Sequence, residues 1–197
     1  MREYYDRRAP EYDDWYLGRG LFAGRDRPGW DEELAELGEA IGTLPSARTL
    51  DVACGTGFLT RHLHGDMVGM DQSARMLEEA ARVVPNAAFV QGDAFAMPFP
   101  DHSFDRVFTG HFYGHLAEPE RTTFLDEARR VARELVVVDA SRNHSDVDDE
   151  MSQRVLEDGS RWQVYKRWFT ASGLADELGD GDVLHEGRWF VVVRAAL

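Results

Sequence analysis

The sequence has 197 residues, of which 43% are hydrophobic and one is a cysteine, so we expect a single domain with one buried core and no internal disulfide. Its formal charge of −14 repels phosphate backbones, and Arg129, Arg130 and Arg133 lie among acidic neighbours, so we expect no nucleic-acid partner. The apolar runs are too short to cross a membrane and the first residues lack the pattern of a secretory signal, which predicts a cytoplasmic location.

Residues 1–45 are interpreted as a lid followed by one helix. The first 27 residues are rich in Tyr, Trp, Asp and Arg, show little apolar periodicity and contain several glycines, which is typical of an arm or lid. Leu34, Leu37 and Ile41 then recur at helical spacing, which predicts an amphipathic helix from about Trp30 that ends near Gly42.

Residues 46–140 alternate between short apolar runs and helical patterns. We expect strands over residues 49–54, 67–71, 88–91, 104–109 and 134–140, and helices over residues 58–63, 73–84 and 119–132. Ser73 has the chemistry of a helix N-cap. This alternation predicts βαβ units, so the fold class is α/β with a parallel sheet covered on both faces.

Residues 141–169 break the alternation with a polar, acidic stretch and then the pattern of a short helix, which we interpret as an insertion over the sheet edge. Residues 170–197 close the domain. Thr170 is expected to cap a helix that ends near Leu178, and strands are expected near residues 182–185 and 189–195. Because the link between these strands is Glu186-Gly187-Arg188, the sheet should end in an antiparallel hairpin.

Two glycines follow the first predicted strand in the run Leu50-Asp51-Val52-Ala53-Cys54-Gly55-Thr56-Gly57. Open α/β sheets bind ligands at the carboxyl ends of their strands, and glycines allow the backbone to approach a ligand closely. A dinucleotide site would place a third glycine at position 60, which is Thr60, and no basic residue flanks the turn. Cys54 is interpreted as a small buried side chain at the strand end, not as a nucleophile.

Carboxylates also end the second and third predicted strands. Asp71 could accept hydrogen bonds from both ribose hydroxyls of an adenosine, and Asp93 could accept one from the adenine amine. Met76 and Phe95 could pack against the purine faces. In the alternative interpretation, the two aspartates only cap the helices that follow them.

These three segments, LDVACGTG, GMDQS and QGDAFAMPFPDHSFDRV, resemble the successive motifs of class I S-adenosylmethionine-dependent methyltransferases. The resemblance extends from about Leu50 to Val138. The opening YYDRRAPEYDDWY is also similar to the entrance segment of small-molecule enzymes of the ubiquinone and menaquinone type. The resemblance implies a three-layer, Rossmann-like sheet of seven strands whose last strand is antiparallel, with S-adenosylmethionine (SAM) as the cofactor and S-adenosylhomocysteine (SAH) as its product.

Carried over position by position, the resemblance implies a set of cofactor contacts and a set of substrate contacts. The methionine moiety would lie against the glycine turn, the ribose on Asp71 and the adenine beside Asp93, with the N-terminal tyrosines as lid residues. The implied cofactor residues are Tyr5, Ala53, Gly55, Gly57, Asp71, Gln72, Met76, Asp93, Ala94 and Thr109, and the implied substrate residues are Tyr12 and Tyr16. Their positions in the sequence add Phe95 to the cofactor residues and His111 and Arg142 to the substrate residues.

The candidates for a general base follow the fourth predicted strand. His111 is the first choice because it is nearest to the strand end, and Tyr113 and His115 come next. Each of them could instead be a hydrogen-bonded side chain that orders the loop. The spacing of the two histidines could also suit a metal, but no HExxH context accompanies them, so we expect no metal site.

Two further alternatives stay open at the sequence level. Arg161, Lys166 and Arg167 could receive an acidic substrate or form a solvated face, and the lid tyrosines could be a flap packed on the sheet. We expect methyl transfer to a small molecule by a monomer or homodimer without membrane or nucleic-acid partners. The alternatives are a SAM-binding protein that catalyses a non-methylating reaction and a dinucleotide oxidoreductase.

Overall fold

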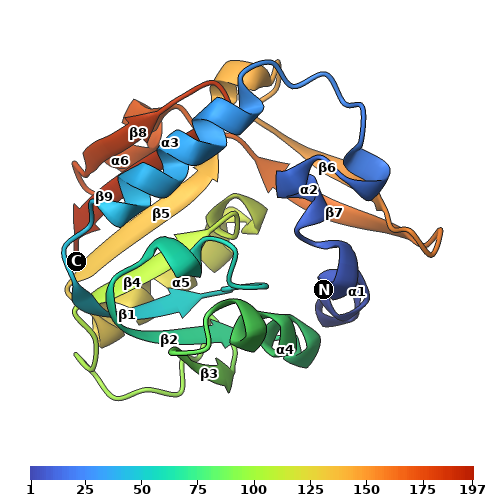
Figure 1. Cartoon of the computed structure of the whole chain (residues 1–197). Helices are drawn as coiled ribbons and strands as arrows, with labels where there is room; N and C mark the ends of the chain where they lie inside the picture. The colour runs from blue at the N-terminus through green and yellow to red at the C-terminus, as the bar shows by residue number, and fades with distance from the viewer.

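The computed structural model describes residues 1–197 and consists of a seven-stranded sheet, a separate two-stranded hairpin and six α-helices (Figure 1). The strands of the large sheet are β1 (Ala47–Val52), β2 (Gly65–Asp71), β3 (Ala88–Gln91), β4 (Arg106–Gly110), β5 (Glu134–Ala140), β8 (Asp182–Glu186) and β9 (Phe190–Ala196). The hairpin consists of β6 (Asp149–Val155) and β7 (Arg161–Arg167). The helices are α1 (Arg2–Arg8), α2 (Asp14–Leu17), α3 (Trp30–Gly42), α4 (Ala74–Val83), α5 (Glu118–Val131) and α6 (Ala171–Glu177).

The strand order of the large sheet is β3-β2-β1-β4-β5-β9-β8. The first five of these strands are mutually parallel, and β9 is antiparallel to both of its neighbours, β5 and β8. The predicted α/β class, the seven strands and the antiparallel closing hairpin are therefore confirmed. The last strand in the chain does not lie at the sheet edge, because it is inserted between β5 and β8.

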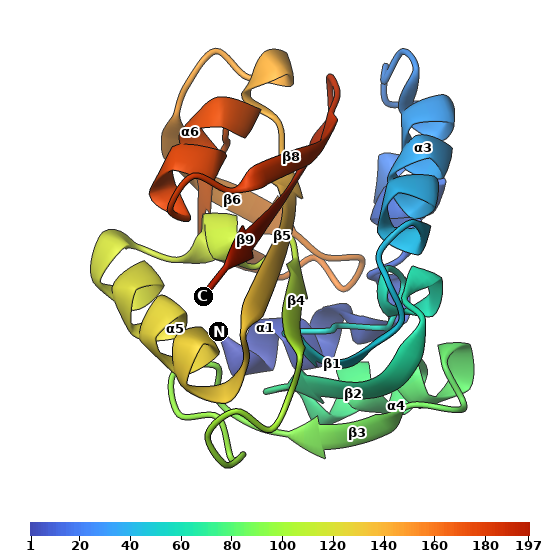
Figure 2. The ribbon, with the colours of Figure 1, turned by 90° about the vertical axis from the view of Figure 1, so that its left-hand side faces the viewer.

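The core lies on both faces of the sheet, as the run Leu135–Val138 in β5 shows. Leu135 and Val137 belong to a cluster with α5 and α6, whereas Val136 and Val138 belong to a second cluster with α3. All four side chains are fully buried. Figure 2 shows α3 on one side of the sheet and α5 and α6 on the other. A strand buried on both faces has a continuous apolar sequence, which is the pattern expected of a parallel sheet.

The helix predicted over residues 58–63 is wrong, because the structure contains only one turn of 3₁₀ helix, Thr60–His62. The Thr60 hydroxyl donates a hydrogen bond of 2.6 Å to the buried Asp51 carboxylate, and Leu63 is already extended. Since β2 begins at Gly65, the chain has no length for a second turn.

The short helix predicted within residues 141–169 is also wrong, because this segment forms the β6–β7 hairpin. Val164 and Lys166 are buried, whereas Arg161 and Gln163 on the same strand are exposed. This period of two is the signal for a strand, and the turn at Glu157-Asp158-Gly159 is typical of a hairpin. None of the helices in the structure combines the length and hydrophobicity that a bilayer-spanning segment needs.

Candidate active site

The glycine turn after β1 is held in a left-handed conformation by the end of β2. Ala53, Gly55 and Gly57 have φ angles of 58°, 55° and 77°, a region that favours glycine. The Asp71 carboxylate accepts hydrogen bonds from the Gly55 amide at 3.0 Å and from the Ser73 amide at 2.9 Å. Asp71 is 8% exposed, and burial raises the pKa of its carboxyl group. The carboxylate therefore fixes the turn and still has free lone pairs.

A cavity of about 520 Å³ opens at the carboxyl ends of β1, β2, β3 and β4. The structure brings most of the predicted cofactor residues to its wall, and the predicted substrate residue Tyr12 lies there with them. The predicted residues that line this cavity are Tyr5, Tyr12, Ala53, Gly55, Asp71, Gln72, Met76, Asp93, Ala94, Phe95 and His111.

Two predicted cofactor residues lie outside this wall. Thr109 is fully buried and its hydroxyl donates a hydrogen bond of 2.8 Å to the Val52 carbonyl, so it ties β4 to β1. Gly57 faces α4, where a Cβ atom would lie 3.2 Å from Val84 and 3.5 Å from the Ala80 methyl group. Gly57 therefore permits close packing of the turn on α4 and does not line the cavity.

Sequence reasoning missed several residues of the same wall. Gly92 lines the cavity, and its position directly before the predicted Asp93 was the signal for it; a Cβ atom there would lie 2.5 Å from the Met70 sulfur. Phe112, next to the predicted His111, also lines the cavity. Arg2 was not predictable, because its contact depends on how α1 folds back over the sheet.

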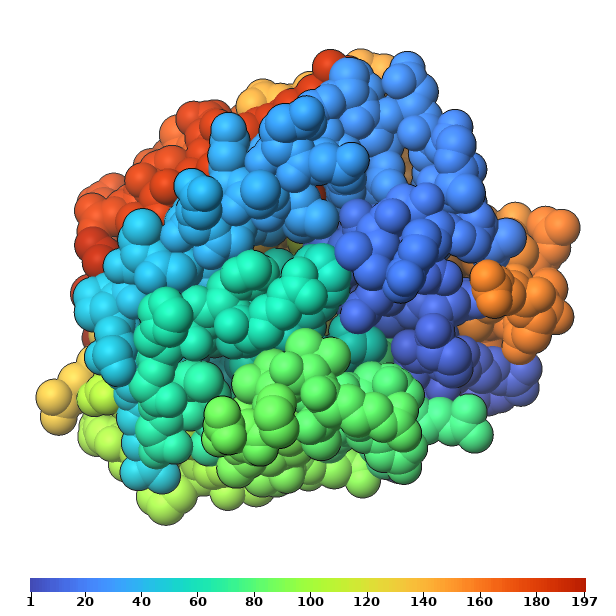
Figure 3. Space-filling model, viewed as in Figure 1, coloured from blue at the N-terminus to red at the C-terminus, as the bar shows by residue number.

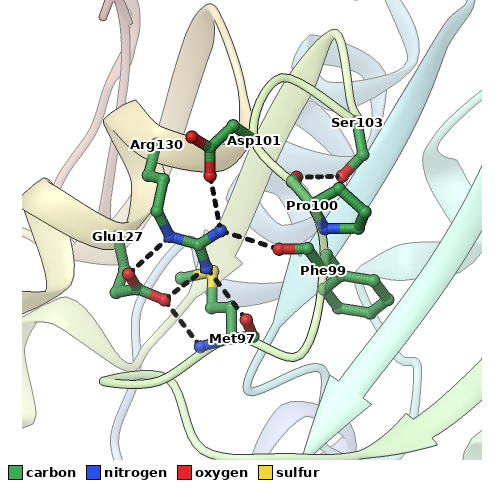
Figure 4. Close-up of polar contacts among 7 residues, drawn as sticks. All are labelled: Met97, Phe99, Pro100, Asp101, Ser103, Glu127 and Arg130. Carbon is green, nitrogen blue, oxygen red and sulfur yellow. Dashed lines mark hydrogen bonds and ion pairs between the residues drawn. The ribbon is translucent and has the colours of Figure 1, made fainter.

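The loop beyond Asp93 and Phe95 is fixed by one arginine of α5 (Figure 4). The Arg130 guanidinium donates hydrogen bonds to the carbonyls of Met97 at 2.9 Å and Phe99 at 2.7 Å, and to the carboxylate of Glu127. Glu127 in turn accepts a hydrogen bond from the Met97 amide at 2.7 Å. Because this clamp satisfies several loop groups at once, it holds the cavity wall that follows β3 in place.

The N-terminal helices close the cavity from the opposite side. Asp6 accepts a hydrogen bond of 2.6 Å from Ser73, the N-cap of α4, and Asp13 accepts one of 2.5 Å from Thr56 in the glycine turn. Figure 3 shows the dark blue N-terminal residues packed between the green residues around α4 and the orange hairpin. The N-terminal segment is therefore bonded directly to the elements that form the cavity.

A second cavity of about 340 Å³ lies between the N-terminal helices and the β6–β7 hairpin. Tyr5, Tyr12 and His111 line both cavities and so form the junction between them. Its wall combines aromatic side chains, such as Trp15 and Trp168, with several arginines.

His111 stands at this junction in a strained conformation, with a φ angle of 54°. Its Nδ1 lies 4.0 Å from the Asp139 carboxylate, and its Nε2 has no hydrogen-bond partner although the residue is only 8% exposed. Burial lowers the pKa of His111 to about 3. The imidazole is therefore neutral near pH 7 and can accept a hydrogen bond.

Asp139 organises the groups around His111. Its carboxylate accepts hydrogen bonds from Lys166 at 2.5 Å and from the Gly114 amide at 2.7 Å, and the positive charge of Lys166 holds the pKa of Asp139 below its usual value. His115 lines the second cavity, and its Nδ1 lies 2.6 Å from the Tyr165 carbonyl oxygen. Burial lowers the pKa of His115 to about 3.

The structure does not bring the other predicted catalytic and substrate residues to either cavity. Tyr113 is fully buried and donates a hydrogen bond of 2.8 Å to Glu177, so it cannot act as the base. Tyr16 is buried and stacks on Phe58 with ring centroids 3.9 Å apart. Arg142 donates a hydrogen bond of 2.7 Å to Asp148. These three side chains are engaged in packing or ion pairing.

The remaining sequence candidates are separated by the structure as well. Lys166 lines the second cavity, whereas Arg161 is exposed and donates to Gln153, and Arg167 pairs with Glu177. Burial raises the pKa of Cys54 well above its usual value. The thiol therefore stays protonated, in agreement with a side chain that is not a nucleophile, but Cys54 is half-buried and not fully buried as predicted.

Comparison with known proteins places residues 49–135 in a family described as a methyltransferase domain. A demethylmenaquinone methyltransferase of Thermotoga maritima is 34% identical over 134 residues, which are 66% of this chain and 55% of that protein. One of Renibacterium salmoninarum is 38% identical over 109 residues, or 52% of this chain and 45% of that protein. The chain thus spans about half the length of these curated relatives.

Among solved structures, the DhpI–SAM–HEP complex superposes with a TM-score of 0.74 at 27% sequence identity, covering 98% of this chain and 94% of that one. The DhpI–SAH complex gives a TM-score of 0.73 at 25% identity, with 98% and 92% coverage. The strand order, the matched methyltransferase-domain model and these relatives together support the resemblance to the class I S-adenosylmethionine-dependent methyltransferases.

Proposed function

We propose that this protein transfers a methyl group from SAM to a small molecule bound in the second cavity. The observation that supports this most directly is the junction: a cavity at the glycine turn and a second cavity share the side chains of Tyr5, Tyr12 and His111. Such a pair of connected cavities suits one site for a donor and one for an acceptor.

The residues of the first cavity fit an adenosine cofactor. Asp71 has free lone pairs beside a backbone turn that admits close approach, and Asp93 is exposed at the end of β3 with one oxygen engaged by the Phe95 amide at 2.9 Å. We assign the ribose hydroxyls to Asp71, the adenine amine to Asp93 and the purine faces to Met76 and Phe95. When bound, SAM supplies a methyl group already activated on a sulfonium.

The chain's own task is then to align the acceptor and exclude water. Holding two reactants in the right orientation can contribute roughly 7 to 11 kcal/mol to lowering a barrier. The neutral His111 can orient an acceptor hydroxyl by accepting its hydrogen bond, and can take its proton as the new bond forms. Because its pKa is low, we assign positioning to His111 as its larger contribution.

Incubation with SAM and a metabolite extract, followed by mass spectrometry, tests the proposal. We expect one or more extract components to gain a single methyl group while SAH accumulates. The Asp71→Ala variant should lose this product, whereas Asp66→Ala, at the exposed opposite end of β2, should keep it.

Two results would contradict the proposal in different ways. Binding of SAM with no methylated product in any extract would favour the alternative of a non-methylating reaction. Binding of NADH without binding of SAH would remove the cofactor assignment itself. A His111→Asn variant, which tolerates the left-handed backbone, should lower kcat and leave the affinity for SAH unchanged.

A further inference from the structure

The second cavity carries a charge opposite to that of the molecule as a whole. Five cationic side chains, Arg8, Arg25, Arg27, Arg154 and Lys166, line it with only two carboxylates, Glu11 and Asp26. The whole chain has 36 acidic and 22 basic residues. An acidic surface alone is sufficient to keep a protein soluble. This local excess of positive charge in an acidic protein therefore has another cause.

The four arginines of this group have no anionic partner in the protein. Lys166 is neutralised by Asp139 at 2.5 Å. Arg8 donates only to the Tyr4 hydroxyl, and Arg27 only to the Trp15 carbonyl. The ion pairs of the surrounding segments use other arginines, namely Arg7, Arg19, Arg142 and Arg167.

Arg154 of β6 shows that these cations share one space. Its side chain forms none of the hydrogen bonds or ion pairs found in the structure, although the residue is half-buried. Burial and the positive charges of Arg8 and Arg25 together lower the pKa of Arg154. Like charges gathered in a partly buried cavity repel one another, and a bound anion would relieve that repulsion.

Three of the guanidinium groups are held in place by aromatic rings. Arg27 lies over Trp30 with its guanidinium carbon 4.0 Å from the ring centroid, Arg25 lies 4.5 Å from Phe22, and Arg8 lies 4.9 Å from Tyr12. A guanidinium stacked by its face keeps its N–H edge free for a carboxylate or phosphate. These three arginines are therefore partly preorganised before any ligand arrives, whereas Arg154 has no aromatic contact of this kind.

We propose that the methyl acceptor is a small organic anion whose carboxylate or phosphate group is bound by Arg8, Arg25, Arg27 and Arg154. This inference rests on the proposed function. The four arginines line only the second cavity, whereas His111, Tyr5 and Tyr12 line both. The anionic group is therefore the anchor, and another atom of the acceptor faces the donor at the His111 junction. The volume of about 340 Å³ limits the acceptor to a small molecule.

Binding of model anions to the SAH-bound protein tests this assignment. Benzoate and phenyl phosphate represent the two anionic groups, and benzamide is an uncharged molecule of similar shape. In calorimetric titrations we expect at least one anion to bind, and to bind at least about tenfold more tightly than benzamide. A preference for one anion would identify which group the acceptor carries.

Matched arginine variants show whether the cluster is responsible. Arg154→Gln and Arg8→Gln should each weaken anion binding by about tenfold or more and leave SAH binding unchanged. Arg161→Gln, on the exposed face of the same hairpin, should have no effect on either ligand. The use of two variants protects the test against a folding defect in one of them.

The outcomes separate this inference from the proposed function. If SAH binds but neither anion does, if benzamide binds equally well, or if both arginine variants keep full anion affinity, the anionic acceptor is wrong and the methyltransferase assignment stands. If SAH fails to bind, the proposed function fails first. In the extract assay, the methylated product should be retained by an anion-exchange resin.

Discussion

Asp71 stabilises the glycine turn that follows β1. Its buried carboxylate accepts two backbone amides, one from the turn after β1 and one from the start of α4. An unpaired amide in this position would carry a desolvation cost of about 1 to 3 kcal/mol. One side chain thus links the positions of β1, β2 and α4 at the sheet edge.

We predict that Asp71→Ala weakens SAH binding by roughly 10- to 100-fold, because the variant loses charged hydrogen bonds to the ligand and to the turn. Calorimetric titration with SAH measures the change. Asp66→Ala serves as the matched control on the same strand, and an unchanged dissociation constant for Asp71→Ala would remove the ribose assignment.

His111, which is buried, and His115, which is half-buried, predict how stability depends on pH. Burial lowers the pKa of His111 and of His115 to about 3, whereas an unfolded histidine titrates near pH 6.5. Below that pH the unfolded state binds more protons than the native state, so stability falls as the pH drops from 7 towards 3. Each histidine then costs on the order of 2 kcal/mol at pH 5.

His115→Gln should reduce this pH dependence, because it removes one titrating group while its amide can still reach the Tyr165 carbonyl. Urea denaturation at pH 7 and pH 5 measures the difference, and His64→Gln, an exposed histidine, is the control. A variant whose stability falls between these pH values as steeply as that of the original protein would contradict the prediction.

At the residue scale, a side chain's position could be predicted from the sequence where it depends only on neighbouring residues. Asp71 and Asp93 follow directly from strand ends and their spacing. The orientations of Tyr113 and Thr109 could not be predicted, because whether a side chain at or beyond a strand end faces the cavity or the core depends on neighbours such as Glu177 and Val52, which are distant in sequence.

At the element scale, the N-terminal helices are held on the sheet by a few specific bonds. Asp6 and Asp13 bond to Ser73 and Thr56, and Tyr4 packs against Leu156 of the hairpin segment. α1 has one buried side chain, Tyr4, whereas α2 is also packed into the core through Tyr16. Few apolar contacts and a few polar anchors are typical of an element that opens more readily than the core. We therefore propose that residues 2–13 act as the lid of the first cavity.

Thr56→Val tests this lid, since it removes the hydrogen bond to Asp13 and nearly conserves volume. SAH should dissociate roughly three- to tenfold faster, consistent with the loss of one hydrogen bond, and amide exchange should rise in residues 2–13 but not in the sheet. Thr43→Val, at the end of α3, should change neither quantity. An unchanged dissociation rate would mean that the helices do not limit ligand release.

The elements that could be predicted from the sequence are those with a strong hydrophobic periodicity or a clear helix N-cap residue. β5 was predicted at its observed bounds, and Ser73 and Thr170 were predicted as N-caps that the structure contains. The β6–β7 hairpin was not predicted, because its acidic, exposed first strand lacks an apolar face. Its partners are the N-terminal helices, which no local pattern reveals.

At the scale of the whole molecule, ligand binding should raise thermal stability. A ligand at about 100 times its dissociation constant stabilises the native state by about 2.7 kcal/mol, which corresponds to about 5 to 11 °C in Tm for a chain of this size. Differential scanning fluorimetry with SAH measures the shift. The shift in Tm should be absent with NADH and reduced in Asp71→Ala. A shift with NADH but not with SAH would contradict the assignment of the first cavity to SAM.

The position of β9 within the sheet also has a consequence for folding during synthesis. β5 pairs with β9 along seven residues, yet about fifty residues separate the two strands in the sequence. During synthesis on the ribosome, β5 therefore emerges with the backbone N–H and C=O groups of one edge unpaired until residues 190–196 follow. An unpaired edge on a Val-rich strand is prone to pair with other chains, so we expect translation pauses within this interval to favour aggregation.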